Sequence, residues 1–138
     1  MSETAPEVST APSVTLGFIK LIVRDLPAMA DFYARALGLH VAQTMESDTM
    51  TEQVLRKTGV NHGPALILYN HKDGREVAVG NGHGPVGFYV RDVDAAYAHA
   101  VREGGAPHTP PTDAGPATRY AFVLDPEGHE IEFVSIRS

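Results

Sequence analysis

The chain carries the same supersecondary unit twice, and this repeat constrains its fold more than any other feature. Val23-Arg24-Asp25-Leu26 aligns without a gap on Val90-Arg91-Asp92-Val93, at an offset of 67 residues (92 − 25). Gly38 and Gly105, which follow the helix predicted in each unit, are separated by the same offset. A shared strand, cap, helix length and helix end indicate that one unit has been duplicated.

Each unit begins with a strand and a capped helix. In the first, residues 16–23 are β-branched or large and apolar, which predicts a strand. Asp25 supplies an N-cap, and Pro27 falls in the first helical turn, where a missing N–H costs little. In the second, residues 87–93 predict a strand, Asp92 caps the helix, and the helix ends at residues 104–105. Apolar residues recur at helical spacing in both units: Met29, Phe32, Tyr33, Ala36 and Leu37, then Val93, Ala96, Tyr97, Ala100 and Val101.

Three strands are expected after each helix, which makes each unit a βαβββ module in an α+β fold. In module one they are residues 39–45, 51–57 and 65–71, and in module two residues 107–112, 119–124 and 130–136. Three prolines make 107–112 an edge strand. We therefore expect one domain over residues 14–138, with module one at 14–74, a connection at 75–84 and module two at 85–138. Residues 1–13, rich in Ser, Thr, Pro, Ala and Glu, are expected to form a flexible tail.

Composition excludes several classes of function. The chain has no cysteine, so disulfides, thiolate catalysis and Cys-ligated metals are absent. Its formal net charge of -6, without a cluster of Lys and Arg, argues against a nucleic-acid partner. No apolar run reaches the length of a membrane span, and the first residues do not read as a secretory signal. A cytoplasmic protein with no membrane partner is the expectation.

Motifs at both ends of the chain resemble one superfamily. An apolar strand, Val-x-Asp, a helix with Phe-Tyr and then Leu-Gly-Leu is similar to the opening of glyoxalase I and its relatives. Asp125-Pro126-Glu127-Gly128-His129-Glu130-Ile131-Glu132 resembles their closing hairpin. The chain thus resembles the vicinal oxygen chelate superfamily, which includes glyoxalases, bleomycin resistance proteins and extradiol dioxygenases. The resemblance implies a concave, partly open β-barrel-like sheet with the helices outside, and a homodimer.

The resemblance also implies a metal site with ligands from both modules, and most of those ligands are missing. The ligand positions of the first, fourth and fifth strands fall on Phe18, near Ile67 and on Pro85, none of which coordinates a metal. Glu132 of the closing hairpin remains, and one ligand does not make a useful divalent site. His83 would join Glu132 only if a metal is bound after all. The other histidines (40, 62, 71, 99, 108 and 129) are expected at surface or turn positions. We expect no cofactor, with Zn, Ni, Mn or Fe as the alternative.

Two charged residues interrupt apolar strands and are the candidate catalytic groups. Lys20 lies between Ile19 and Leu21, and Glu132 lies between Ile131 and Phe133. Strand alternation and the resemblance place both on the concave face, where an ammonium and a carboxylate that meet satisfy each other. The hypothesis is that they pair, with Lys20 as electrophile or general acid and Glu132 as base; a purely structural pair is the alternative. By the same alternation and resemblance, Phe18, Tyr120 and Phe122 line the cavity for a small-molecule ligand, with ordinary core packing as the alternative.

Three functions remain open. The chain binds or transforms a small organic molecule without a metal, or it sequesters a drug without turnover, between the subunits of a dimer. The third is a metal-dependent lyase, isomerase or dioxygenase of the glyoxalase type. Metal content and chemical change in a bound molecule distinguish the three.

Overall fold

A computed structural model describes residues 10–137 as two βαβββ modules with the same internal topology. Module one contains β1 (Phe18–Ile22), α1 (Leu26–Leu37), β2 (Leu39–Glu46), β3 (Met50–Lys57) and β4 (Ala65–His71). Module two contains β5 (Val86–Tyr89), α2 (Val93–Arg102), β6 (Ala106–Asp113), β7 (Thr118–Leu124) and β8 (Glu130–Ile136). The α+β class and the duplicated modules are confirmed, and β6 is an edge strand as predicted. Of the predicted tail, residues 1–9 lie outside the described residues, and 10–13 contain no helix or strand.

The two helices begin as their sequences predict. The Asp25 carboxylate accepts a hydrogen bond from the Ala28 amide at 3.0 Å, and Asp92 accepts one from Ala95 at the same distance. At the end of α1, Gly38 adopts a φ of 70°, which a residue with a Cβ rarely adopts. Local sequence therefore determines where the helices lie along the chain.

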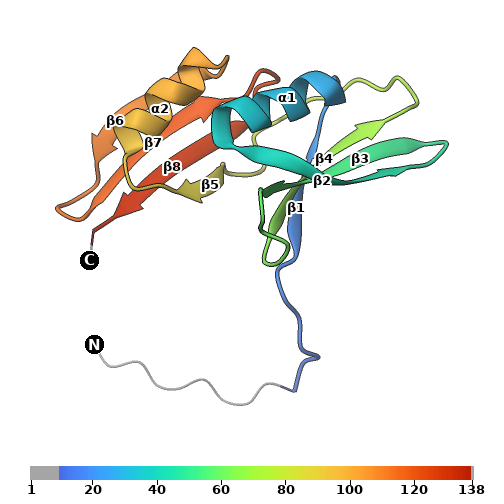
Figure 1. The fold of residues 1–138 in the computed structure, drawn as a ribbon, viewed down its shortest axis with the longest axis horizontal. Coiled ribbons are helices and arrows are strands. Elements are labelled where there is room, and N and C mark those ends of the chain that lie inside the picture. The colour runs from blue at the N-terminus through green and yellow to red at the C-terminus, as the bar shows by residue number, and fades with distance from the viewer. Residues whose placement is uncertain (1–9, 138) are drawn as a thin grey trace.

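The strands form two separate four-stranded sheets. Sheet one has the order β1-β4-β3-β2, and sheet two has the order β5-β8-β7-β6. The first strand of each module runs parallel to the last, and the other pairs are antiparallel. The sheets are not closed into a barrel; they lie next to each other, and both helices cover the same side (Figure 1). Neither helix within residues 10–137 has the length and apolar character needed to cross a bilayer.

The core lies between the helices and one face of each sheet. Its largest fully buried side chains come from α1, from both sheets and from the start of α2: Tyr33, Phe32, Met29, Leu55, Leu68, Ile131, Val23, Val93 and Val123. Because strand side chains alternate between faces, the neighbours of these residues point away from the helices. We call these helix-free surfaces the open faces of sheets one and two.

Candidate functional site

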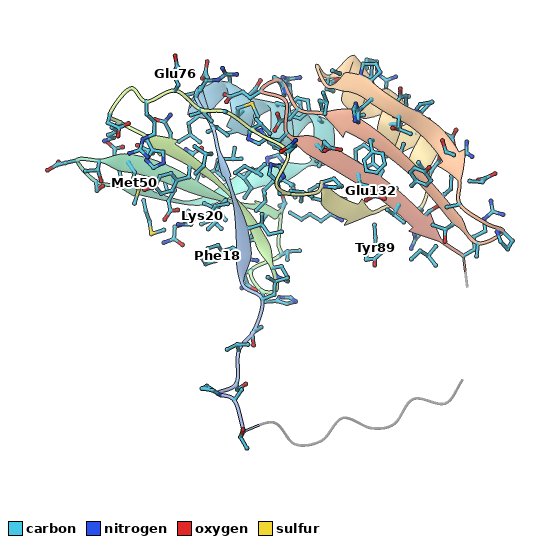
Figure 2. All side chains as sticks on the ribbon, turned by 180° about the vertical axis from the view of Figure 1, so that it is seen from behind. Phe18, Lys20, Met50, Glu76, Tyr89 and Glu132 are labelled. Carbon is cyan, nitrogen blue, oxygen red and sulfur yellow. The ribbon has the colours of Figure 1, made fainter. Side chains whose placement is uncertain are left out.

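Lys20 lies on the open face of sheet one. Its neighbour Leu21 belongs to the helix-side core, so Lys20 points the other way, as Figure 2 shows for Lys20 and Phe18. Register adds the neighbours: Lys20 is opposite Ile67 on β4, and Tyr69, two residues further on, is opposite Glu52 on β3. Paired residues share a face, so Glu52 and Tyr69 accompany Lys20.

The ammonium of Lys20 forms an ion pair with Glu52 rather than with Glu132. Nζ lies 2.9 Å from Oε2 of Glu52, whose side chain is 6% exposed, whereas the Lys20 side chain is 37% exposed. The same Nζ lies 5.4 Å from the ring centroid of Phe18 and 5.1 Å from that of Tyr69. A half-exposed cation held by a buried carboxylate and two rings is an anchor for an oxygen or an aromatic surface of a ligand.

The hypothesis that Lys20 pairs with Glu132 within one chain is therefore wrong. β8 carries Glu132 in sheet two, whereas β3 carries Glu52 next to β4 in sheet one. Among residues 10–137, the Glu132 side chain has no hydrogen-bond or ion-pair partner. It lines a shallow pocket with Tyr89 and Ile136, both exposed.

Sheet two gathers aromatic and acidic side chains on its own open face. Phe122 is opposite Glu132, and Tyr120 shares the face by alternation. The rings of Tyr120 and Phe122 meet edge to face at 5.7 Å. His108, at an irregularity of β6, brings its ring to 6.4 Å from Phe122 and its Nε2 to 3.8 Å from Glu130. Tyr120, Phe122 and Glu132 thus share one face as predicted, whereas Phe18 lies on the other sheet.

A cavity of about 390 Å³ lies where module one meets module two. We call it the seam cavity. Its apolar walls come from β1, from the connection between the modules and from the start of β5, and Lys20, His83, His129 and Glu130 supply its polar groups. The volume falls within the range of small-molecule sites, which are mostly apolar with a few placed polar groups.

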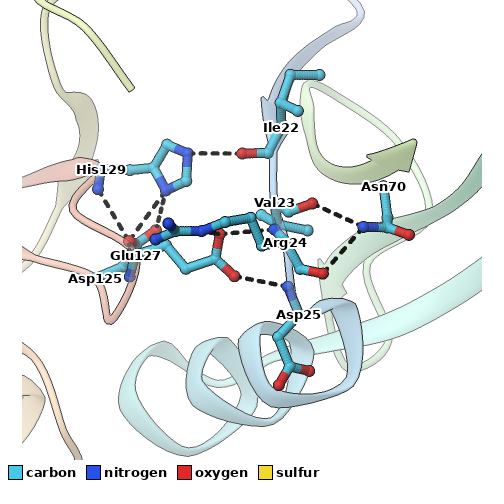
Figure 3. Close-up of polar contacts among 8 residues, drawn as sticks. All are labelled: Ile22, Val23, Arg24, Asp25, Asn70, Asp125, Glu127 and His129. Atoms are coloured by element: carbon cyan, nitrogen blue, oxygen red, sulfur yellow. Dashed lines mark hydrogen bonds and ion pairs between the residues drawn. The ribbon is translucent and has the colours of Figure 1, made fainter. Parts of the chain in front are cut away.

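The closing hairpin joins the two modules beside this cavity (Figure 3). The Glu127 carboxylate accepts the backbone N–H groups of Arg24 and Asp25 at 2.7 and 2.8 Å. Nε2 of His129 lies 3.0 Å from the carbonyl oxygen of Ile22, and Asp125 lies against the other ring nitrogen. His129 is only 4% exposed, because its ring lies in the junction between the modules. The expectation of a surface or turn position is therefore wrong about its burial.

Most of the residues at the superfamily's metal-ligand positions lack suitable donor atoms. Phe18 and Pro85 have no donor side chain, and Ile67 is buried and apolar. Both ring nitrogens of His83 lie near carbonyl oxygens, of Gly84 at 2.9 Å and of Val79 at 3.1 Å. Within residues 10–137, no three His, Asp or Glu side chains converge as a metal site requires. The donor set of this chain does not fit the usual divalent metal.

Comparison with known proteins decides the family. The sequence profile of the Glyoxalase/Bleomycin resistance protein/Dioxygenase superfamily matches residues 15–133. The chain belongs to this superfamily. It is 32% identical over 131 residues to the anthracycline biosynthesis protein DnrV of Streptomyces peucetius, covering 95% of this chain and 44% of DnrV. It thus spans less than half the length of that relative. It is also 28% identical over 124 residues to a lactoylglutathione lyase of Neisseria meningitidis, covering 86% of this chain and 88% of the lyase.

Solved structures share the fold. Glyoxalase I of Zea mays superimposes with a TM-score of 0.79 at 21% identity, covering 89% of this chain and 45% of that one. A trypanothione-dependent glyoxalase I of Leishmania major gives 0.76 at 22% identity, covering 89% and 87%. TioX of Micromonospora gives 0.66 at 22% identity, covering 89% and 99%. At these identities the likeness establishes the fold alone.

Sequence reasoning found Lys20 but not its partner, and it did not foresee the seam. Glu52 was not among the candidate site residues. Strand alternation was the available signal for this partner. It places Glu52 on the same face of β3 as Val54, so one face of this strand combines a carboxylate with an apolar side chain. No local signal reveals that His129 reaches the backbone of Ile22, because 107 residues separate them.

Proposed function

We propose that this chain binds a small, planar, largely apolar organic molecule in the seam cavity, with the Lys20–Glu52 pair as its polar anchor and without a divalent metal. The observation that carries the proposal is the cation of Lys20, fixed by a buried carboxylate at 2.9 Å and bordering an apolar cavity. Phe18 and Tyr69 offer ring edges and faces next to the same cation. The missing metal donors support an anchor of a different kind.

The name of one relative suggests a class of ligand to try. DnrV is an anthracycline biosynthesis protein, and anthracyclines are planar aromatic molecules with several oxygens. Such a molecule suits an apolar cavity with a cationic anchor. Turnover is the stronger version of the proposal, in which Lys20 acts as general acid or electrophile toward a substrate oxygen. Glu132 lines a different pocket, on sheet two, so it does not act as the base in the seam cavity of the same chain.

We also propose that the chain works as a homodimer that covers the open faces. Large apolar side chains are exposed there, among them Phe18 at 53% and Tyr89 at 84%. Surfaces of this kind mark protein contacts or ligand sites. A sedimentation measurement should give twice the 14.8 kDa of one chain, and a monomer at micromolar concentration would contradict the dimer.

The test is a fluorescence titration with two planar aromatic probes, doxorubicin and 1-anilinonaphthalene-8-sulfonate. Lys20→Met should weaken binding by about tenfold, equal to about 1.4 kcal/mol. Lys57→Met is the matched control, since Lys57 is an exposed lysine on β3, and it should leave binding unchanged. Equal affinity in wild type and Lys20→Met would refute the anchor.

Metal analysis separates the metal-dependent alternative. Purified protein should carry Zn, Ni, Mn and Fe only in substoichiometric amounts, and probe binding should persist in a chelator. A stoichiometric metal whose removal abolishes binding would favour the glyoxalase-type alternative. Probe binding with no chemical change in the probe supports sequestration over turnover for that compound.

A further inference from the structure

The ring of His129 touches hydrogen-bond acceptors at both nitrogens. Nε2 lies 3.0 Å from the carbonyl oxygen of Ile22, on β1 of module one. Nδ1 lies 2.8 and 3.0 Å from the two carboxylate oxygens of Asp125, in the hairpin of module two. A neutral imidazole has only one N–H and satisfies only one of these contacts, whereas an imidazolium donates to both. Only the doubly protonated ring satisfies both contacts.

Asp125 completes a buried ion pair with this ring. Its carboxylate also accepts the Tyr33 hydroxyl at 2.7 Å and the amides of Glu127 and His129 at 3.0 and 2.9 Å. Each of these partners donates a hydrogen bond to the carboxylate. The His129 side chain is 5% exposed and that of Asp125 is 0% exposed, so little solvent reaches the pair. Removing one charge from such a pair is far more costly than replacing both.

Next to this ion pair, Glu127 makes a second set of hydrogen bonds across the seam. Glu127 accepts the amides of Arg24 and Asp25, which directly follow β1 (Figure 3). The hairpin thus holds β1 through the carbonyl of Ile22 and through these two amides. Ile22 and His129 also line the seam cavity, so this attachment determines the distance between two of its walls.

Charged groups of both signs surround the ring. Asp125 and Glu127 lie on its own hairpin and Tyr33 on α1, Arg24 follows β1, and Lys20, Glu130 and His83 line the cavity. Burial lowers the pKa of His129, but the hydrogen bond and charge of Asp125, the carbonyl of Ile22 and the charge of Glu127 raise it, and the net shift is upward.

We propose that the imidazolium of His129 pins β1 of module one to the closing hairpin of module two, so that loss of its proton loosens the seam and weakens ligand binding in the cavity. The first half concerns the chain by itself. The second half rests on the function proposed above. The two halves are tested by separate measurements.

Hydrogen exchange tests the pin without any ligand. The amides of Arg24 and Asp25 are held across the seam, so their protection factors measure its opening. Their protection should fall by about tenfold as pH rises through the His129 titration, the effect expected when one charge-assisted hydrogen bond across the seam is lost. The Ala95 amide, held by Asp92 within α2 alone, is the internal control and should keep its protection. Unchanged protection of Arg24 and Asp25 relative to Ala95 would overturn the pin.

Nitrogen NMR of the histidine rings measures the protonation state of His129 directly in the wild-type protein. His129 should remain doubly protonated just above about pH 6.5, where a free histidine side chain loses its proton, and a neutral His129 ring at that pH would overturn the proposal. Asp125→Asn should move the loss of protection to lower pH, and His129→Gln should remove the pH dependence. His40→Gln is the control that leaves both unchanged.

Titration of 1-anilinonaphthalene-8-sulfonate at each pH tests the second half. Affinity should fall over the same pH range as the protection of Arg24 and Asp25. Protection that falls while affinity stays constant overturns the link to the cavity. A probe that binds at no pH contradicts the proposed function, while the exchange experiment still decides the pin.

Discussion

Truncating Lys20 tests whether Glu52 depends on its cation. In Lys20→Met the Glu52 carboxylate stays 6% exposed and loses its ion-pair partner. Its Oε2 has no hydrogen-bond partner within residues 10–137, so nothing else compensates the charge. Removing one partner of a fully buried ion pair costs roughly 3–5 kcal/mol. Because the Lys20 side chain is 37% exposed, solvent screens the pair, and we expect about 2 kcal/mol.

Equilibrium unfolding in urea at pH 7, at fixed protein concentration, measures this cost. A loss of about 2 kcal/mol lowers the urea midpoint by about 1 M for a domain of ordinary denaturant sensitivity. The double variant Lys20→Met/Glu52→Met should recover most of the loss, because replacing a buried pair by apolar side chains is often neutral. Lys57→Met, at an exposed position, should stay within about 0.5 kcal/mol of wild type.

Acid provides a second check on the same variant. The penalty in Lys20→Met should shrink as pH falls toward about 4.3, the pKa of glutamate in water, because a buried carboxylate without its cation takes up a proton more readily and a neutral acid is cheaper to bury. A penalty under about 0.5 kcal/mol at pH 7 would refute the reasoning, since the buried carboxylate would then be stable without the ammonium. A penalty that the double variant does not relieve would show that the lysine stem, not the charge, is what matters.

Three further predictions concern the seam and the helices. Tyr33→Phe removes the hydroxyl that donates to buried Asp125 and should cost about 1–2 kcal/mol in urea unfolding; no change would mean that the hydrogen bond adds nothing. Asp92→Ala removes the N-cap of α2 and should cost about 1 kcal/mol, with Asp48→Ala, at an exposed position outside the helices, as the control. The pKa of His129 is raised in the folded chain, so its stabilisation is complete below about pH 6.5 and is lost as pH rises through the raised value. The urea midpoint of wild type should therefore fall over that range, whereas His129→Gln should show a flatter dependence, and parallel curves would contradict this.

Local signals were sufficient to predict the secondary structure. Asp25 and Asp92 cap their helices with the same 3.0 Å contact, and the strands of β4 and β8 begin and end where their apolar runs do. Capping and strand patterning depend on residues a few positions apart, which the sequence displays directly. The repeated topology of the two sheets then follows from one module occurring twice.

The site was only half predictable. Alternation along β1, together with the family resemblance, predicts that Lys20 lies opposite the helices, and the same reasoning places Glu132 with Phe122 and Tyr120. Strand alternation does not determine which carboxylate pairs with the ammonium of Lys20. That depends on β3 lying next to β4 in sheet one while β8 lies in sheet two.

The sequence by itself determined the two modules and their order of elements, and it shows that Phe18 and Pro85, at positions where the family resemblance implies ligands, carry no metal donor. Each of these is a property of residues near one another in the chain. Only the tertiary structure decided that Lys20 pairs with Glu52 and that His129 bridges to Ile22. These contacts join residues 32 and 107 positions apart (52 − 20; 129 − 22), and the packing of whole sheets against the helices sets them. The physical reason is that burial of the shared core determines which strands lie next to each other, and the charged side chains pair with the groups that this packing places within reach.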